Sequence, residues 1–330
     1  MKKIKKVLAL IFSSVMVLSL VSCGGSNTQS TNTVSGEKQA KKVSIATGGT
    51  SGTYYGFSGV VANVLTEKTG ITFTTESTGA SKVNVQLVDA GESQIAILQN
   101  DVMSYAFNAT DMFKGENKVQ SFSAIASVYP EEIQIVARKG INNVAELKGC
   151  KVSVGDAGSG TEFNARQILE AYGLDIEKDI IKNNQSFADS ADSIKNGSID
   201  AAFVTAGSPT VAITELSSTY DFNLVSMDDA HIGILQSKYP FYTKTPIAAN
   251  TYKPVTTETN GVAVMATFIA SNGLDEETVY QFTKGLFEYK SEFQHAKAAL
   301  LDAKIGITGT GDVPFHPGAI KYYKEIGLMK

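Results

Sequence analysis

Residues 43–55 read VSIATGGTSGTYY, and this stretch decides the fold. A short run of apolar and β-branched residues leads straight into a glycine-rich turn, which predicts a strand followed by a turn. Apolar residues then recur at helical spacing as far as Leu65, which predicts a helix. Residues 151–161, KVSVGDAGSGT, repeat the arrangement. Two strand–turn–helix units of this kind predict an α/β protein with a largely parallel sheet.

Around these two units, β-branched runs alternate with helical patterns. Further strands are expected at residues 71–76, 94–98, 122–128, 133–138, 199–204, 222–225 and 262–270, and further helices at 81–89, 190–195 and 275–301. A polar stretch at 139–143 precedes the second unit. We therefore expect lobe I at residues 43–140, lobe II at 141–245 and a return segment of lobe I at 246–330, so that the chain crosses twice between the lobes.

The first 22 residues have the layout of a secretory signal peptide. Four lysines precede an uncharged apolar run of about 15 residues, which is shorter than the roughly 20 that a spanning helix needs. The run ends at Cys23, in a pattern that resembles a bacterial lipobox. This likeness implies lipid on the Cys23 sulfur, and hence an exported protein held at the outer face of the cytoplasmic membrane by its lipid alone. Residues 23–42 are polar and are expected to form a flexible tether.

Charge and cysteine content disfavour several classes of protein. The formal net charge is −4, and loss of the four signal lysines lowers it to −8, which makes nucleic acid an improbable partner. The chain has two cysteines. Because lipidation uses Cys23, Cys150 is left without a partner for an intrachain disulfide, and we expect it to be an inert core residue.

Both glycine-rich turns have the features of an anion cradle. Unpaired amides at the start of each helix point outward, glycines allow close approach of a ligand, and the arrangement suits a carboxylate. In the first turn, Thr50 or Ser51 could instead merely cap the helix. The second turn has the glycine spacing of a phosphate loop, but Thr161 stands where that motif needs lysine, so nucleotide hydrolysis is disfavoured. The amides from Gly158 to Thr161 remain as a cradle.

Catalytic and metal centres find little support in the sequence. The histidines, His231, His295 and His316, are scattered without metal-ligand spacing, and no serine lies in a G-x-S-x-G elbow. We therefore expect no catalytic residue, no bound metal and no cofactor. A hydrolase that uses the Ser159 turn is the enzymatic alternative, and it lacks a partnered base.

Seven segments, taken in order, carry a likeness to one family of proteins. They are residues 48–55 (GGTSGTYY), 78–84 (TGASKVN), 129–131 (YPE), 147–162 (LKGCKVSVGDAGSGTE), 197–203 (GSIDAAF), 207–209 (GSP) and 316–319 (HPGA). Together they resemble the TAXI family of TRAP-transporter solute-binding proteins over nearly all of residues 43–328. Seven matches in order are far more specific than any one of them.

The resemblance implies a two-lobed, type II periplasmic-binding-protein fold with a ligand cleft between the lobes. It also implies binding without catalysis, and delivery of a small acid such as glutamate or 2-oxoglutarate to an integral membrane TRAP subunit driven by an ion gradient. The ligand shell that it implies consists of Thr50, Ser51, Tyr54, Ser77, Gly79, Asn84, Gln99, Asp101, Ser159, Gly160, Thr161, Gly207 and Ser208. A sensor lipoprotein that binds the same ligand without transport is the alternative function.

Four side chains leave the recognition of an acid open. Arg138 and Arg166 are the only arginines, and each either clamps a carboxylate or forms a surface ion pair. Lys82 stands where the family leads us to expect a smaller or aliphatic residue, and it either points to solvent or supplies a cation to the ligand. Tyr54 can pack in the core as readily as it can cover a ligand.

Overall fold

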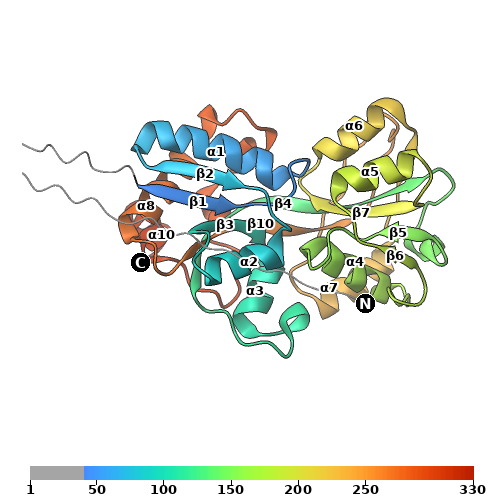
Figure 1. Ribbon diagram of the computed structural model, residues 1–330, viewed down its shortest axis with the longest axis horizontal. Coiled ribbons are helices and arrows are strands. Elements are labelled where there is room, and N and C mark those ends of the chain that lie inside the picture. The colour runs from blue at the N-terminus through green and yellow to red at the C-terminus, as the bar shows by residue number, and fades with distance from the viewer. Residues whose placement is uncertain (1–40) are drawn as a thin grey trace, which may run out of the picture. The chain divides into compact units, whose positions relative to one another are not determined.

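One mixed β-sheet extends through residues 41–330, the part of the chain that the computed structural model describes (Figure 1). The predicted signal peptide, Cys23 and nearly all of the predicted tether lie outside the described residues. The strand order is β2-β1-β3-β10-β4-β7-β5-β6, with β8 paired to β4 and β9 paired to β10. The strands are β1 (Lys42–Ala46), β2 (Thr72–Glu76), β3 (Ile95–Gln99), β4 (Phe122–Arg138), β5 (Lys151–Ser153), β6 (Ile181–Asn183), β7 (Ala201–Ala206), β8 (Phe222–Leu224), β9 (Thr243–Lys244) and β10 (Val262–Ser271).

The sheet is parallel towards both ends and antiparallel in the middle. β1 pairs in parallel with β2 and β3, and β5 pairs in parallel with β6 and β7. In contrast, β10 runs antiparallel to β3 and β4, and β4 runs antiparallel to β7. The prediction of a largely parallel sheet is therefore wrong for the centre. The reason is that β10, from late in the chain, inserts between β3 and β4, and periodicity does not reveal such a long-range pairing.

β4 is a single strand of 17 residues where the pattern predicts two. It pairs with β10 from Phe122 to Glu132 and with β7 from Glu132 to Ala137, so one partner takes over where the other ends. Pro130 lies opposite Met265 in the pairing with β10 and does not end the strand.

Helices cover both faces of the sheet. They are α1 (Thr53–Thr69), α2 (Ser81–Asp89), α3 (Asn100–Asn108), α4 (Gly160–Ala171), α5 (Phe187–Lys195), α6 (Val211–Thr219), α7 (Asp229–Lys238), α8 (Glu276–Glu288), α9 (Ala303–Gly306) and α10 (Pro317–Glu325). Over the β1–β2–β3 end, α1, α8 and α10 pack on one face, and α2 and α3 pack on the other (Figure 1). Over the β5–β7 end, α4 and α7 share one face, and α5 and α6 share the other.

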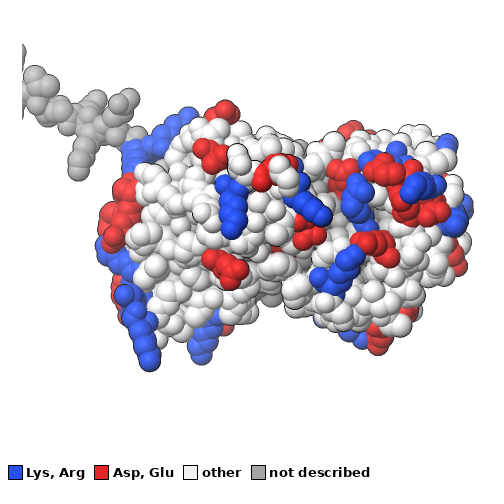
Figure 2. Space-filling model, turned by 90° about the horizontal axis from the view of Figure 1, so that it is seen from below, with Lys and Arg blue, Asp and Glu red and all other residues white. Residues whose placement is uncertain are grey.

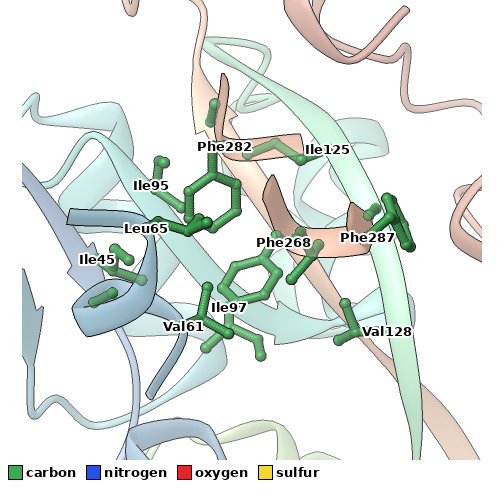
Figure 3. Close-up of a cluster of buried hydrophobic side chains, with 14 of the residues drawn as sticks. Ile45, Val61, Leu65, Ile95, Ile97, Ile125, Val128, Phe268, Phe282 and Phe287 are labelled. Atoms are coloured by element: carbon green, nitrogen blue, oxygen red, sulfur yellow. The ribbon is translucent and has the colours of Figure 1, made fainter. Parts of the chain in front are cut away.

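Buried apolar side chains fall into two groups along the chain. The first core draws on residues 43–129 and 266–329, and the second core on residues 133–264. In the first core, Phe282 packs edge-on against Phe268 with their ring centroids 5.2 Å apart (Figure 3). The changeover between the cores falls inside β4 and β10, which are thus the two strands that join them. Figure 2 shows the surface narrowing between two masses, with acidic and basic side chains intermixed on both.

Candidate functional site

The two glycine-rich turns line one cavity, which lies between the first and the second core. From the first turn come residues of the β1–α1 connection, and from the second come residues at the start of α4. The cavity has a volume of about 40 Å³, which is room for about three water molecules. Its lining consists of Gly48, Gly49, Ser51, Gly52, Thr53, Tyr54, Ala80, Ser81, Gln99, Glu131, Asp156, Ser159, Gly160, Thr161, Phe187, Thr205 and Ala206.

Helix α1 begins at the cavity without a side-chain cap. Gly52 is its N-cap residue, and no side chain within residues 41–330 accepts a hydrogen bond from the first turn. The alternative that Thr50 or Ser51 caps the helix is therefore wrong. Because the first amides of a helix lack intrahelical partners, those of Thr53 and Tyr54 are available to an anion in the cavity. The Thr53 hydroxyl donates 2.9 Å away to the Gly207 carbonyl, which ties α1 to the second core.

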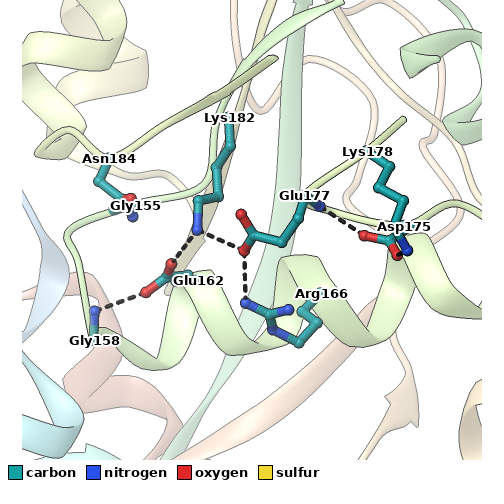
Figure 4. Close-up of polar contacts among 9 residues, drawn as sticks. All are labelled: Gly155, Gly158, Glu162, Arg166, Asp175, Glu177, Lys178, Lys182 and Asn184. Atoms are coloured by element: carbon teal, nitrogen blue, oxygen red, sulfur yellow. Dashed lines mark hydrogen bonds and ion pairs between the residues drawn. The ribbon is translucent and has the colours of Figure 1, made fainter. Parts of the chain in front are cut away.

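Helix α4 faces the same cavity, and part of its N-terminus is already occupied. The Ser159 hydroxyl caps the helix by accepting from the Glu162 amide at 3.2 Å. The Glu162 carboxylate in turn accepts from the Gly158 amide at 2.7 Å (Figure 4). Among the described residues, the amides of Gly160 and Thr161 have no acceptor. The second cradle is therefore narrower than the predicted stretch from Gly158 to Thr161.

No lysine or arginine of the described residues lines the cavity. Arg138 pairs with Asp200 at 2.7 Å, on an exposed surface. Arg166 pairs with Glu177 at 3.2 Å along the outside of α4 (Figure 4). Lys82 pairs with Glu116 at 2.6 Å. All three cations are thus engaged outside the cavity. The two arginines form surface ion pairs, which was one of their alternatives, whereas Lys82 neither points to solvent nor lines the cavity but pairs with Glu116.

Six residues of the predicted ligand shell line the cavity together. They are Ser51, Tyr54, Gln99, Ser159, Gly160 and Thr161. Tyr54 is buried, and its hydroxyl donates at 2.5 Å to Glu131.

Seven predicted residues lie near the cavity without lining it. They are Thr50, Ser77, Gly79, Asn84, Asp101, Gly207 and Ser208. Thr50 is exposed, and Ser77 donates to the Gly48 carbonyl at 3.1 Å. Buried Asn84 donates to the carbonyls of Thr47 and Ile97 at 2.5 and 2.7 Å, so it holds the end of β1 in place. For these residues the structure offers supporting contacts in the turn, while contact with a ligand stays a prediction.

Gln99 belongs to a buried network that joins the two cores. Its Nε2 donates to Asn164 Oδ1 at 2.9 Å, and the Thr205 hydroxyl donates to the same oxygen at 3.1 Å. Asn164 Nδ2 donates to Asp101 Oδ2 at 3.1 Å and to the Tyr242 hydroxyl at 2.7 Å. Asp101 thus fixes the orientation of the Asn164 amide by accepting its hydrogen bond. Of these two residues, Gln99 lines the cavity and Asp101 does not.

Glu131 is the most consequential cavity residue that the predicted ligand shell omits. It lies in the middle of β4 with 1% of its surface exposed. Its neighbour Glu132 accepts from the Ser208 amide at 2.8 Å and lies 3.7 Å from Nζ of Lys297, a buried residue of the 3₁₀ helix η4 (Ala296–Leu300). Two adjacent glutamates inside a strongly apolar strand are a signal that was present in the sequence. Nothing in the sequence indicated that Lys297 lies beside Glu132.

Burial governs the protonation of Glu131 and Asp101. It raises the pKa of Glu131 well above the usual range, against the lowering effect of the hydrogen bond from Tyr54. It also raises the pKa of Asp101, to about 6. Removing a carboxylate from water disfavours its charged form, and Lys297, which lowers the pKa of Glu131, does not reverse the effect of burial.

The histidines, Cys150 and the other potential metal ligands within residues 41–330 do not form a metal site or a catalytic site. Among residues 41–330, no three His, Cys, Asp or Glu side chains come together as metal ligands. His295 and His316 cap helices through their rings, accepting from the amides of Lys297 and Gly318. Burial raises the pKa of the half-buried Cys150 thiol, which makes it a poor nucleophile. The described helices include none that combines the length and apolar character needed to span a bilayer.

Comparison with known proteins identifies the family to which the chain belongs. The NMT1-like family matches residues 45–327. The chain belongs to the NMT1-like family. The match is to that family as a whole, and the likeness to the TAXI family in particular stays a prediction from the motifs.

Solved structures share the fold of this NMT1-like protein at low sequence identity. A protein from Bordetella bronchiseptica RB50 is 17% identical, with a TM-score of 0.54, covering 87% of this chain and 81% of that one. A structure described as a periplasmic transporter is 11% identical, with a TM-score of 0.51 and coverage of 88% and 93%. PhnD1 from Prochlorococcus marinus (MIT 9301), solved with methylphosphonate, is 12% identical, with a TM-score of 0.50 and coverage of 87% and 96%. The NMT1-like chain therefore has the α/β, two-lobed fold of periplasmic substrate-binding proteins, as the resemblance implies.

Proposed function

We propose that this NMT1-like protein is an exported, lipid-anchored solute-binding protein that captures a small organic acid, such as glutamate or 2-oxoglutarate, and delivers it to a membrane permease. The observation that carries the proposal is the convergence of two helix N-termini, those of α1 and α4, on one small cavity. Each helix end stabilises an anion by roughly 0.3 to 1 kcal/mol, and by more where the cavity excludes water. With no arginine at the cavity, amides and hydroxyls must hold the carboxylate.

Capture is proposed to proceed by closure of the two lobes. Contacts between Thr53 and Gly207, and between Gln99 and Asn164, join the two sides of the cavity. Release of a ligand must break them. The points where β4 and β10 pass from one core to the other are the natural hinges. The predicted lobe boundaries at residues 140/141 and 245/246 lie on the second-core side of these two points. A ligand that binds both lobes shifts the equilibrium to the closed state.

The seven ordered motifs favour a TRAP permease of the TAXI type as the partner. The fold alone does not distinguish one kind of transporter from another, since a structure described only as a periplasmic transporter also shares it. The energy source separates these cases. Uptake that collapses when the ion gradient is dissipated supports the TAXI proposal, and uptake that instead follows the ATP level contradicts it.

Calorimetric titration of residues 24–330 with glutamate, 2-oxoglutarate, glutamine, succinate and phosphate tests the binding function. Saturable one-to-one binding without turnover is the expected result, and appearance of a reaction product would support the hydrolase instead. Deletion of the gene then separates transport from sensing. The proposal expects uptake of the bound acid to fall, whereas unchanged uptake favours the sensor lipoprotein.

A further inference from the structure

Gln99, a residue of the cavity lining, carries an unused hydrogen-bond acceptor. The residue ends β3 and is 2% exposed, and its side chain lines the cavity. Its Oε1 is buried, and it has no hydrogen-bond partner among the described residues. Because a buried acceptor without a donor is costly, such an atom points to a donor that the bound ligand supplies.

The network behind Gln99 fixes which atom of its amide is left without a partner. Asn164 Nδ2 donates to the Asp101 carboxylate and to Tyr242, so Asn164 Oδ1 must face Gln99. The Thr205 hydroxyl donates to this same oxygen. Gln99 can therefore satisfy Asn164 only through its NH₂ group, and a flipped amide would set two oxygens against each other. The carbonyl oxygen of Gln99 is thus the atom that remains for the ligand.

Glu131 supplies a second acceptor in the same cavity. One of its oxygens accepts from the Tyr54 hydroxyl at 2.5 Å, and the other has no donor among the described residues. The nearest buried cation, Lys297, lies 3.7 Å from the neighbouring Glu132. Asp156 also lines the cavity, so the lining drawn from the described residues includes carboxyl groups and no cation. Burial raises the pKa of Glu131, and an ammonium group placed beside it would favour the ionised carboxylate, whereas an anionic group would not.

We propose that Gln99 Oε1 and Glu131 form an ammonium subsite, and that the cavity takes an α-amino acid in preference to a keto acid or a simple dicarboxylate. This rests on the proposed function. The α-carboxylate accepts from the free amides at the starts of α1 and α4, while the α-ammonium group donates to the two acceptors. A zwitterion matches both ends of the site, because it brings three N–H donors and a positive charge to the acidic end.

A matched series of ligands tests the preference on the unaltered chain. L-Glutamate, 2-oxoglutarate and glutarate share a five-carbon dicarboxylate skeleton and differ only at the second carbon. In calorimetric titrations of residues 24–330 we expect glutamate to bind at least about 100-fold more tightly than either analogue, since a site built for a donor rejects ligands that lack it. Glycine and alanine belong in the panel, because the cavity is small.

Two variants assign the preference to its residues. Glu131→Gln removes the carboxyl group that a bound ammonium would hold in its ionised form but keeps an acceptor for Tyr54, and it should lower the affinity for glutamate about 100-fold while changing that for glutarate little. Glu132→Gln is the matched control, since its side chain lies outside the cavity lining and should leave the preference intact. Thermal unfolding verifies that each variant folds, and the ligand series on the unaltered chain decides the proposal if one does not.

The outcomes separate this inference from the function on which it rests. Tight binding of 2-oxoglutarate or glutarate, equal to that of glutamate, overturns the ammonium subsite and leaves the binding function standing. A preference for glutamate that survives Glu131→Gln overturns the role of Glu131. Failure of the unaltered chain to bind any amino acid or organic acid in the panel overturns both proposals.

Discussion

A methyl group added at Gly160 probes the cavity at its tightest point. Gly160 is the first residue of α4, and a Cβ placed there lies 2.0 Å from Gln99 Oε1 and 2.5 Å from Gln99 Cδ. Non-bonded heavy atoms settle at about 3.5 Å or more, so the Gln99 side chain must retreat by more than about 1 Å. The backbone of Gly160 is not left-handed, and alanine is a good helix former, so the variant leaves the helix itself undisturbed.

Retreat of Gln99 breaks its 2.9 Å hydrogen bond to Asn164 and withdraws its carbonyl oxygen from the cavity. Leaving such buried groups unpaired costs about 1 to 3 kcal/mol. Because this bond joins the two cores, the cost falls on the closed, ligand-binding arrangement, and it corresponds to a loss of affinity of roughly 5- to 150-fold. Calorimetric titration of Gly160→Ala with L-glutamate measures this loss directly.

Gly59→Ala is the matched control for this variant. Gly59 lies within α1, and a Cβ placed there meets nothing within 4 Å. The control should bind as the unaltered chain does and unfold at a slightly higher temperature, since alanine is favoured over glycine in helices by about 1 kcal/mol. Unchanged affinity in Gly160→Ala, or an equal loss in both variants, would refute the reasoning.

Three further perturbations test the packing and the buried charges. Phe282→Ala empties a fully buried position of the first core and should lower the unfolding free energy in urea by about 3 to 5 kcal/mol; a loss under about 1 kcal/mol contradicts the assigned core. Lys297→Met leaves Glu132 without its cation and should cost about 3 to 5 kcal/mol in the same assay, with Lys297→Met/Glu132→Gln recovering part of that loss; no recovery argues against the pair. Asp101, with its pKa raised to about 6, binds its proton more tightly in the folded than in the unfolded state, so its protonation stabilises the fold. Its contribution to the unfolding free energy therefore grows by about 2 kcal/mol as the pH falls from 7 to 4, and Asp101→Asn should lack this dependence; identical pH slopes in the two proteins refute the assignment.

Local sequence patterns predict the parts of the site that are built from contiguous residues. The turn at Ser159–Gly160–Thr161 is one such part, because glycine spacing, a capping serine and a following helix are all encoded within a few residues. The same holds for the β1–α1 turn, although its helix lacks the side-chain cap that Thr50 or Ser51 could supply.

Features that depend on long-range packing escape such reasoning. Lys297 reaches Glu132 from a segment 165 residues further along the chain, and nothing in its own surroundings indicates burial. The insertion of β10 between β3 and β4 is of the same kind, since a strand's apolar pattern does not name its partners. Glu131 is intermediate, because its sequence context marks it as unusual, while its place at the cavity follows only from the fold.

The central claim is that the N-termini of α1 and α4 hold one ligand between them. Backbone amide chemical shifts in a ¹⁵N-labelled protein, followed during titration with L-glutamate, test it most directly. We predict that the amides of Thr53, Tyr54, Gly160 and Thr161 shift together, with a single dissociation constant equal to the calorimetric one. Saturation of binding with a response at only one helix terminus, or at neither, would contradict the account.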